Sequence, residues 1–326
     1  MADLVTFGET MLRLSPPAGT RLETEGSLDA QVGGAESNVA AAASCLGVDA
    51  TWLSKLPANP LGRRVVRALR SHDITPAVAW DDRDAARLGT YYLEYGADPR
   101  NTEVIYDRAH SSITTVSAAD LDGSVLDSAG VFHTTGITPA LSEAAAETTM
   151  ELLSAAREAG AVRSFDLNYR AKLWTPAEAK AAYESILPEI DLLFAPVRDA
   201  RGVLEYEGDA EAVARSLAVD YDIETVVVTR GADGSLALVE DEVIEQGIFD
   251  SEAIDAIGTG DAFVGGVLGE LLADSEVTLT AAQIETALSY GAAAAALKRS
   301  LAGDVLVATR EELERVRDAS AGGISR

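Results

Sequence analysis

The chain has 326 residues, of which 47% are hydrophobic, so it is long enough to bury a substantial core in one large or two unequal domains. It carries 53 acidic and 26 basic residues, and its formal net charge of -27 excludes nucleic acid as a partner because the two would repel each other. Residues 1–10 lack the pattern of a signal peptide, no stretch is long and apolar enough to cross a membrane, and the single cysteine, Cys45, excludes disulfides. We therefore expect a cytoplasmic protein that does not bind membranes.

Short apolar strand patterns alternate with amphipathic helical patterns along most of the chain. The predicted strands cover residues 4–9, 51–56, 162–168, 191–196 and 224–231, and the predicted helices cover residues 35–47, 62–71, 177–187 and 209–221. Apolar strands connected by helices imply a mainly parallel sheet with helices on both faces. The predicted class is α/β, with residues 1–326 forming a single domain.

Two stretches, residues 10–32 and 86–112, break this alternation and are predicted to be extended. In the second, aromatic and β-branched residues flank the turn sequence GADPRN, as in a β-hairpin. We expect these stretches to form a small β-sheet inserted into the larger α/β domain. Such a sheet can be a lid that keeps water from a reacting group, or an ordinary surface hairpin, and the pattern does not separate these two interpretations.

Near the N-terminus, the sequence GGAESN precedes a helical pattern. Gly33 and Gly34 permit close approach of a ligand to the backbone, and the amide of Asn38 both donates and accepts hydrogen bonds, as binding of a polyol requires. The alternative is a plain turn from strand to helix.

A second glycine-containing loop lies late in the chain, in the sequence VVVTRGADGSLAL. Residues 226–228 are predicted to form a buried strand, followed by a tight loop that contains Thr229, Gly231 and Gly234 and then by a returning strand. The loop can hold the phosphates or the sugar of a nucleotide, or it can be a simple hairpin turn.

About thirty residues later, the sequence DAIGTGDAF leads directly into the apolar helical pattern of residues 262–273. Gly258 and Gly260 let the backbone expose its N–H groups where the helix begins, and this arrangement binds anionic phosphate. A carboxylate at the start of a helix is ionised at neutral pH, so Asp261 can accept the proton of an attacking hydroxyl group. The alternative is a glycine turn in which Asp261 only caps the helix.

Together, the order and spacing of GGAESN, TRGADG and DAIGTGDAF resemble the PfkB (ribokinase-like) family of carbohydrate kinases over nearly the whole chain. The resemblance implies a three-layer fold with a β-sheet lid, ATP and Mg²⁺ as cofactors, and Asp261 as the catalytic base. It also implies that Gly258, Thr259 and Gly260 form the anion hole, and that ATP binds at Thr229, Gly231, Gly234, Gly258 and Gly260.

The segment DLNYRAKLW, with GTYYLE and IYDRAHS from the predicted lid, is similar to the 2-keto-3-deoxygluconate kinases of that family. An arginine suits a sugar acid because its guanidinium forms paired hydrogen bonds with a carboxylate. The resemblance implies a substrate pocket formed by Gly33, Gly34, Asn38, Tyr91, Tyr106, Arg108, Ile137, Asp166, Asn168 and Arg170. The implied reaction is ATP-dependent phosphorylation of 2-keto-3-deoxygluconate or its galactonate epimer at the terminal hydroxyl.

The chain departs from the family at residues 196–199, where Pro-Val-Arg-Asp replaces the frequent Asn-x-x-Glu that helps to order the metal and the phosphates. Asp199 can still act on the metal through bound water. The sequence leaves open which epimer is used and whether a monovalent cation lies beside Asp255. The alternative functions are phosphorylation of a neutral sugar such as fructose, and sugar or nucleotide sensing without turnover.

Two further expectations concern assembly and environment. Family lids often pair between subunits, so the resemblance implies a homo-oligomer formed through the lid. Four of the 26 basic residues are lysines, and uniform acidity with few lysines is typical of proteins from salt-accumulating halophiles, in which salt screens the repulsion. The alternative is an acidic enzyme from a mesophile.

Overall fold

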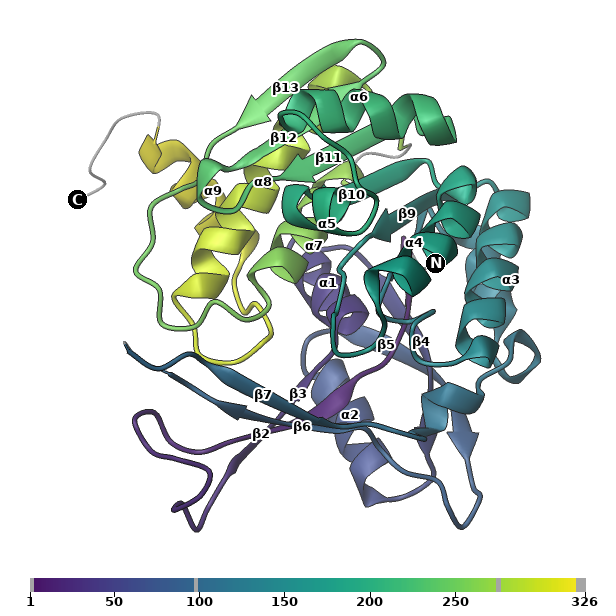
Figure 1. Cartoon of the computed structure of the whole chain (residues 1–326), viewed down its shortest axis with the longest axis vertical. Coiled ribbons are helices and arrows are strands. Elements are labelled where there is room, and N and C mark those ends of the chain that lie inside the picture. Colours follow the sequence, from purple (N-terminus) through teal and green to yellow (C-terminus); the bar gives the residue numbers. More distant parts are fainter. Residues whose placement is uncertain (1–2, 97–98, 274–276, 321–326) are drawn as a thin grey trace.

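The computed structural model describes residues 3–96, 99–273 and 277–320 (Figure 1). The predicted strands and helices are present, with ends that differ from the predicted bounds by a few residues. The tip of the predicted hairpin, at residues 97–98, lies outside the described ranges.

A nine-stranded sheet forms the centre of the large layered region, in the order β13-β12-β11-β10-β9-β8-β1-β4-β5. Its strands are β1 Leu4–Phe7, β4 Ala50–Pro57, β5 Ile74–Asp81, β8 Val131–Thr135, β9 Val162–Asp166, β10 Leu192–Pro196, β11 Thr225–Thr229, β12 Ser235–Val239 and β13 Glu242–Gln246. All neighbouring strands from β5 to β11 run parallel, and β12 and β13 add an antiparallel edge. The predicted α/β class with a mainly parallel sheet is confirmed.

Helices cover both faces of this sheet, as a parallel sheet with apolar strands requires (Figure 1). One face carries α3 Glu143–Ala159, α4 Pro176–Ile186, α5 Val197–Gly202 and α6 Ala210–Tyr221, and the other carries α1 Ala35–Ser44, α2 Pro60–Arg70, α7 Thr259–Leu271 and α8 Ala281–Arg299, with α9 Arg310–Ser320 against α8. Local sequence fixes several helix starts: the side chain of Asn59 caps α2, and Thr175 and Glu178 form a capping box at α4. Among the described residues, no helix combines the length and the apolar character that a membrane span needs.

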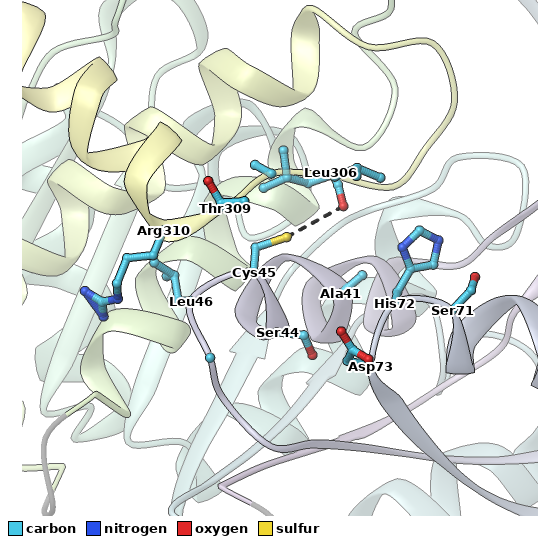
Figure 2. A pocket seen from close by; sticks show the side chains of 13 residues that line it. Ala41, Ser44, Cys45, Leu46, Ser71, His72, Asp73, Leu306, Thr309 and Arg310 are labelled. Atoms are coloured by element: carbon cyan, nitrogen blue, oxygen red, sulfur yellow. Dashed lines mark hydrogen bonds between the residues drawn. The ribbon is translucent and has the colours of Figure 1, made fainter.

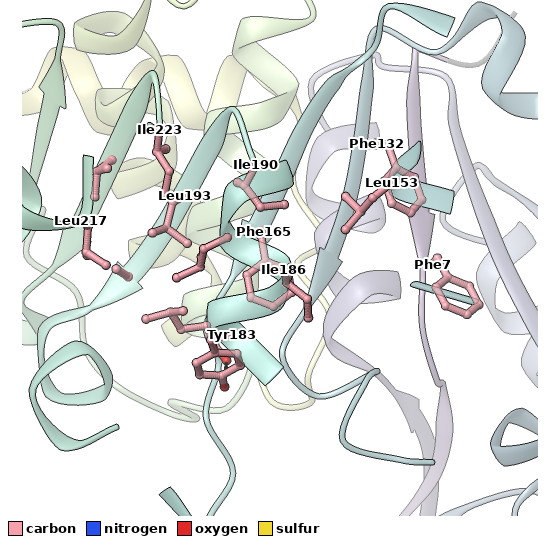
Figure 3. Close-up of a cluster of buried hydrophobic side chains, with 14 of the residues drawn as sticks. Phe7, Phe132, Leu153, Phe165, Tyr183, Ile186, Ile190, Leu193, Leu217 and Ile223 are labelled. Atoms are coloured by element: carbon pink, nitrogen blue, oxygen red, sulfur yellow. Dashed lines mark hydrogen bonds between the residues drawn. The ribbon is translucent and has the colours of Figure 1, made fainter. Parts of the chain in front are cut away.

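The core on the α3–α6 side contains aromatic and aliphatic side chains from adjacent strands. Phe132, Phe165 and Leu193 project from β8, β9 and β10, and they meet Leu153 of α3 and Tyr183 of α4 (Figure 3). Burying each of these side chains stabilises the fold by about 1.5–3 kcal/mol. This packing fixes the strands whose ends form the site described below.

A second sheet of four strands, in the order β3-β2-β6-β7, lies across the carboxyl ends of the large sheet (Figure 1). It consists of β2 Met11–Ser15, β3 Asp29–Gly33, β6 Thr90–Glu94 and β7 Glu103–Asp107. Its strands come from the two stretches that were predicted to be extended, apart from Gly33, which continues β3 by one residue. The small sheet therefore covers the edge where ligands bind in open α/β sheets.

Candidate active site

A cavity of about 790 Å³ lies between the small sheet and the carboxyl ends of the large sheet. The strand order reverses at β1, which continues to β4 on one side and is adjacent to β8 on the other, and such a switch point leaves a crevice. The lining includes the residues predicted for catalysis, for substrate and for metal: Gly33, Gly34, Asn38, Tyr91, Tyr106, Arg108, Ile137, Asp166, Asn168, Arg170, Asp199, Gly258, Thr259, Gly260 and Asp261. The fold thus brings together residues from six separate segments of the chain.

The loop before α7 lines this cavity, and the backbone amides of Gly258 and Gly260 have no hydrogen-bond partner among the described residues, whereas that of Thr259 donates to the carbonyl oxygen of Ala256 at 3.3 Å. Gly258 precedes the helix with a φ of 76°, and a Cβ atom there would lie 2.0 Å from the carbonyl oxygen of Asp304, so only glycine fits. No side chain caps the amides of the first turn, and a Cβ atom at Gly260 would have no atom within 4 Å. These N–H groups, at the positive end of the helix dipole, are suited to an anion.

Asp261 lies in the first turn of α7, and its carboxylate accepts a hydrogen bond of 2.7 Å from the side-chain amide of Asn38. Burial raises the pKa of Asp261. The hydrogen bond from Asn38 and the charge of Arg170 oppose this upward shift, and the charge of the nearby Asp304 adds to it. The sequence argument considered the reference pKa and the helix dipole and did not include desolvation, which raises the pKa here. A raised pKa makes the ionised carboxylate of Asp261 a stronger base.

Two more carboxyl groups, Asp166 and Asp199, line the same cavity. Burial, with the charges of Asp261 and Asp199, raises the pKa of Asp166 to about 8, and Arg170 opposes this shift. Asp199 accepts hydrogen bonds of 3.1 Å from the backbone N–H of Tyr169 and from Nε of Arg198, and burial raises its pKa. These three carboxyl groups make the cavity floor rich in acidic side chains.

These carboxylates provide hard oxygen ligands of the kind that Mg²⁺ binds, but they do not form a closed cage. Within the described part of the chain, no three acidic, histidine or cysteine side chains are close enough to hold an ion together. Mg²⁺ commonly keeps several waters and uses one or two carboxylates plus substrate phosphates. The site fits that mode of binding, since Asp166, Asp199 and Asp261 all line the cavity.

The two arginines of the predicted substrate pocket have different surroundings. A guanidinium nitrogen of Arg108 lies 2.5 Å from one carboxylate oxygen of Glu9, and the other oxygen accepts a hydrogen bond of 2.6 Å from the hydroxyl of Ser111. Arg170 has no ion pair within 4 Å among the residues the structure describes. Arg170 is thus the arginine with its charge available, while Arg108 shares its charge with Glu9.

Beside the main cavity lies an apolar pocket of about 220 Å³, and the two share Thr229, Gly231, Thr259 and Gly260. Gly234, predicted for nucleotide binding, lines this pocket and not the main cavity. The other walls are mainly apolar and come from the β13–α7 segment and from α8: Ile248, Phe249, Phe263, Ala292, Ala295 and Ala296. This pocket has the size and character suited to the base of a nucleotide.

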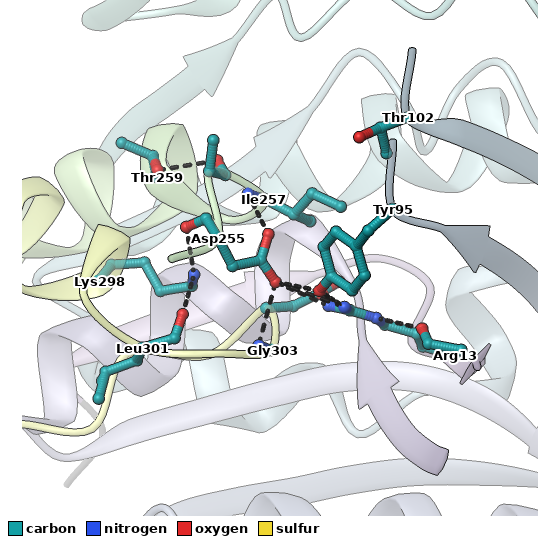
Figure 4. Close-up of polar contacts among 12 residues, drawn as sticks. Arg13, Tyr95, Thr102, Asp255, Ile257, Thr259, Lys298, Leu301 and Gly303 are labelled. Atoms are coloured by element: carbon teal, nitrogen blue, oxygen red, sulfur yellow. Dashed lines mark hydrogen bonds and ion pairs between the residues drawn. The ribbon is translucent and has the colours of Figure 1, made fainter. Parts of the chain in front are cut away.

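A buried polar cluster lies on the other side of the loop before α7 (Figure 4). Arg13 of β2 reaches from the small sheet to the carboxylates of Asp255 and Asp304, and the hydroxyl of Tyr95 donates to Asp255. The hydroxyl of Tyr91 donates to Asp304. The cluster therefore ties the small sheet to the two segments that contain Asp255, before the loop of α7, and Asp304.

Sequence reasoning did not identify Glu9, Arg13, Asp304 or Lys298 as parts of the site. Two of them left a signal: Glu9 follows a buried strand directly, and Arg13 is a charged residue in the apolar stretch MLRLS. Lys298 is a lone lysine in an alanine-rich helix, and Asp304 lies in a loop with no distinguishing pattern.

A separate hollow of about 480 Å³ contains Cys45 and shares no lining residue with the cavity of Asp261 (Figure 2). The Cys45 sulfur lies 3.9 Å from the carbonyl oxygen of Leu306, and burial raises the pKa of the thiol. A raised pKa makes a thiol less reactive.

Comparisons with known proteins agree with the geometry. The pfkB family of carbohydrate kinases matches residues 1–310. A 2-dehydro-3-deoxygalactonokinase of the halophile Haloferax volcanii is 55% identical, in an alignment that covers 100% of this chain and 99% of the relative. Fructokinase-2 of Zea mays is 28% identical, in an alignment that covers 95% of this chain and 93% of the relative. The crystal structure of a 2-dehydro-3-deoxygluconokinase from Thermotoga maritima superposes with a TM-score of 0.88 at 34% identity, covering 97% of this chain and 98% of that one. The halophilic relative fits the salt-adapted composition of the chain.

Proposed function

The chain belongs to the pfkB family of carbohydrate kinases, and we propose that it phosphorylates a 2-keto-3-deoxy sugar acid at the terminal hydroxyl with ATP. The observation that carries this proposal is the composition of one cavity, which is lined by Asp261, by Gly258 and Gly260 with their free backbone amides, and by the unpaired Arg170. A kinase for a neutral sugar has no use for an available cation at its substrate site. The names of two relatives, the 55% identical sequence and the 34% identical structure, support the same substrate class.

The substrate carboxylate is proposed to bind at Arg170, with Arg108 as the second cation. Charge-assisted hydrogen bonds from a guanidinium to a carboxylate are about twice as strong as neutral ones. The hydroxyl groups of the acid meet Asn38, Tyr106 and the backbone at Gly34. The name of the Haloferax relative favours the galactonate epimer as the preferred substrate.

Asp261 is proposed to remove the proton from the terminal hydroxyl as that oxygen attacks the phosphorus atom in line. Asn38 donates to one oxygen of Asp261, which fixes the carboxylate and leaves the other oxygen free for the substrate. The amides of Gly258, Thr259 and Gly260 hold the negative charge of the phosphoryl group during transfer. The small sheet above the cavity acts as the lid that excludes water.

ATP is proposed to place its base in the apolar pocket beside Gly234 and its phosphates along Thr229, Gly231 and the amides before α7. Mg²⁺, when bound to the phosphates, neutralises charge that develops in the transfer. Asp199 would be the residue that holds such an ion, through bound water. An ATP-dependent reaction agrees with the cytoplasmic location expected from the sequence.

We also propose a homodimer formed through the small sheet. On the face of this sheet away from the cavity, Ala30, Leu14, Tyr92 and Ile105 form one cross-strand row, and Ile105 is 48% exposed. Leu14, Ala30 and Tyr92 are half-buried and Ile105 is exposed, so this apolar row across four strands is only partly covered within one chain, and a second copy can cover the rest. The elution volume of the protein in molar KCl, compared with that of the Ile105→Lys variant, tests this proposal.

The test of the function is ADP release in molar KCl with four substrates: the galactonate and gluconate forms of the 2-keto-3-deoxy acid, fructose and ribose. We expect a higher kcat/KM for the two acids than for either sugar. Higher kcat/KM for fructose would assign the chain to the neutral-sugar kinases instead. Binding of acid and ATP without ADP release would identify a sensor.

A further inference from the structure

Lys298 is a fully buried lysine near the catalytic loop. Its side chain has a relative exposure of 0%, in a chain with only four lysines among 26 basic residues. It lies on α8, and its ammonium group donates to the backbone carbonyl oxygens of Asp255 at 3.2 Å and Leu301 at 3.4 Å (Figure 4). A buried ammonium is costly unless it is paired, so this position calls for an explanation.

The charges around Lys298 balance. The buried carboxylates of Asp255 and Asp304 accompany the two cations Lys298 and Arg13. Burial lowers the pKa of Lys298, and the charges of Asp255 and Asp304 oppose that shift. The two carboxylates thus favour the charged form of the lysine.

The two carbonyl groups that Lys298 holds belong to the two segments under the catalytic loop. Asp255 starts the loop, and its carboxylate accepts from the backbone N–H of Ile257 at 3.0 Å and of Gly303 at 3.1 Å. The segment that follows Leu301 contains Asp304, whose carbonyl oxygen lies against Gly258. Lys298 therefore joins both segments at a point three residues from the anion-binding amides.

Backbone carbonyl oxygens with a nearby carboxylate are also the ligands of a monovalent metal ion, which the sequence left open beside Asp255. The residues present do not fit such an ion between Asp255 and Leu301, because the ammonium already takes their carbonyl groups. A compact ammonium can enter such a space, whereas the broad guanidinium of arginine cannot.

We infer that the ammonium group of Lys298 is a built-in monovalent cation that positions the loop of residues 258–260, so that phosphoryl transfer needs no alkali ion beside Asp255. This inference rests on the proposed function, since that function gives the loop its role. Lys298 is a positioning residue: it acts on the reaction through the backbone of Asp255 and does not touch the substrate.

The first arm of the test uses the wild-type protein in KCl, NaCl or tetramethylammonium chloride at equal ionic strength. We expect kcat for the sugar acid to differ by less than about twofold among the three salts. The melting temperature should differ by no more than about a few degrees. A specific requirement of kcat for K⁺ would overturn the inference while leaving the kinase function intact. A wild-type protein that phosphorylates no sugar acid would contradict the proposed function. The melting temperatures in the three salts would still show whether the fold needs K⁺ in addition to the ammonium group of Lys298.

The second arm uses Lys298→Ala, with Lys180→Ala as the control because Lys180 pairs with Glu205 at the surface. We expect Lys298→Ala to lower kcat by about 10–100-fold in tetramethylammonium chloride with little change in KM for the acid, and Lys180→Ala to match the wild type. Adding K⁺ or methylammonium should restore about tenfold of the lost rate, because these small cations fit the vacated space. Retention of the wild-type kcat without an added cation would overturn the inference.

If Lys298→Ala does not fold, Lys298→Met preserves most of the side-chain volume and removes only the charge. We expect its melting temperature to rise when K⁺ replaces tetramethylammonium, unlike that of the wild type. Equal melting temperatures of the methionine variant in both salts, at wild-type kcat, would count against the built-in cation.

Discussion

Two groups of charged residues lie on opposite sides of the loop before α7, and they differ in balance. On the side of the small sheet, Arg13 and Lys298 accompany Asp255 and Asp304, and the structure shows an ion pair or hydrogen bond for each member. On the cavity floor, the carboxyl groups of Asp166, Asp199 and Asp261 lie near Arg170. Among the described arginines that line the cavity, Arg170 is the one without an ion pair.

This difference separates residues that hold the structure from residues that we propose to take part in the chemistry. The balanced cluster has no charge left for a ligand, so it can serve as a rigid support for the loop. The floor has more carboxyl groups than cations, and burial raises the pKa values of Asp166 and Asp261 above their usual range. Groups with such shifted pKa values are typical of sites that bind and transfer protons.

The largest expected effect is on the floor side, in Asp261→Asn. We expect kcat to fall by about 10²–10⁴-fold, because the variant loses the general base, while ATP still binds to the unchanged amides. ADP release and ATP titration by calorimetry measure the two quantities. A variant with near wild-type kcat would show that Asp261 only caps the helix.

The comparison becomes sharpest with one substitution on each side, Arg13→Met and Arg170→Met. Removing Arg13 leaves the two buried carboxylates of Asp255 and Asp304 with Lys298 as their one remaining cation, which should cost about 3–5 kcal/mol in the free energy of unfolding. Removing Arg170 should leave stability nearly unchanged and raise KM for the acid by at least about 30-fold, with KM for ATP unaffected.

Urea unfolding in molar KCl and steady-state kinetics, applied to both variants, measure these effects. If Arg170→Met destabilises the protein as much as Arg13→Met does, the cavity floor supports the fold as much as the cluster of Arg13, Lys298, Asp255 and Asp304 does. If Arg170→Met retains the KM and the preference for acids over fructose, Arg170 is not the carboxylate ligand.

How much the sequence could predict follows the same division. The floor residues lie in motifs with a local reason for their composition: Gly258 must have a positive φ, and Asp261 follows it at a helix start. Strand ends are also predictable from apolar patterns, and parallel strands bring Asp166, Asp199 and Thr229 to one edge.

The balanced cluster has no such local signal. Arg13 meets Asp255 across 242 positions of the sequence and Asp304 across 291, and such pairs depend on how the small sheet docks on the large one. The ion pair between Glu9 and Arg108 also depends on how the small sheet docks, because Arg108 follows β7 of that sheet and Glu9 follows β1 of the large one. The raised pKa of Asp261 was missed for a related reason, since burial is a property of the whole fold.

A smaller effect is expected from Arg108→Met, because Arg108 already shares its charge with Glu9. We expect KM for the acid to rise by about 5–30-fold, and stability to fall by about 1–3 kcal/mol as Glu9 is left buried without its cation. Adding Glu9→Gln to this variant should recover stability but not KM. A double variant that recovers both would show that Arg108 serves the fold and not the substrate.

The smallest expected effect is a shift in pH dependence in Asn38→Ala. Asp261 is active when ionised, so kcat/KM is lost as the pH falls through its pKa, which burial holds above the usual range for aspartate. The hydrogen bond from Asn38 favours the ionised form, and its removal raises the pKa further. A hydrogen bond to a charged group contributes about 1.5–3 kcal/mol, so the acid limb of the profile should move to higher pH by about one to two units. Arg170→Met should move the limb in the same direction, because Arg170 also lowers this pKa. The plateau at high pH should fall less than the rate at low pH, since Asp261 is ionised there in all variants. An acid limb that stays in place in both variants would mean that a group other than Asp261 controls the loss of activity in acid.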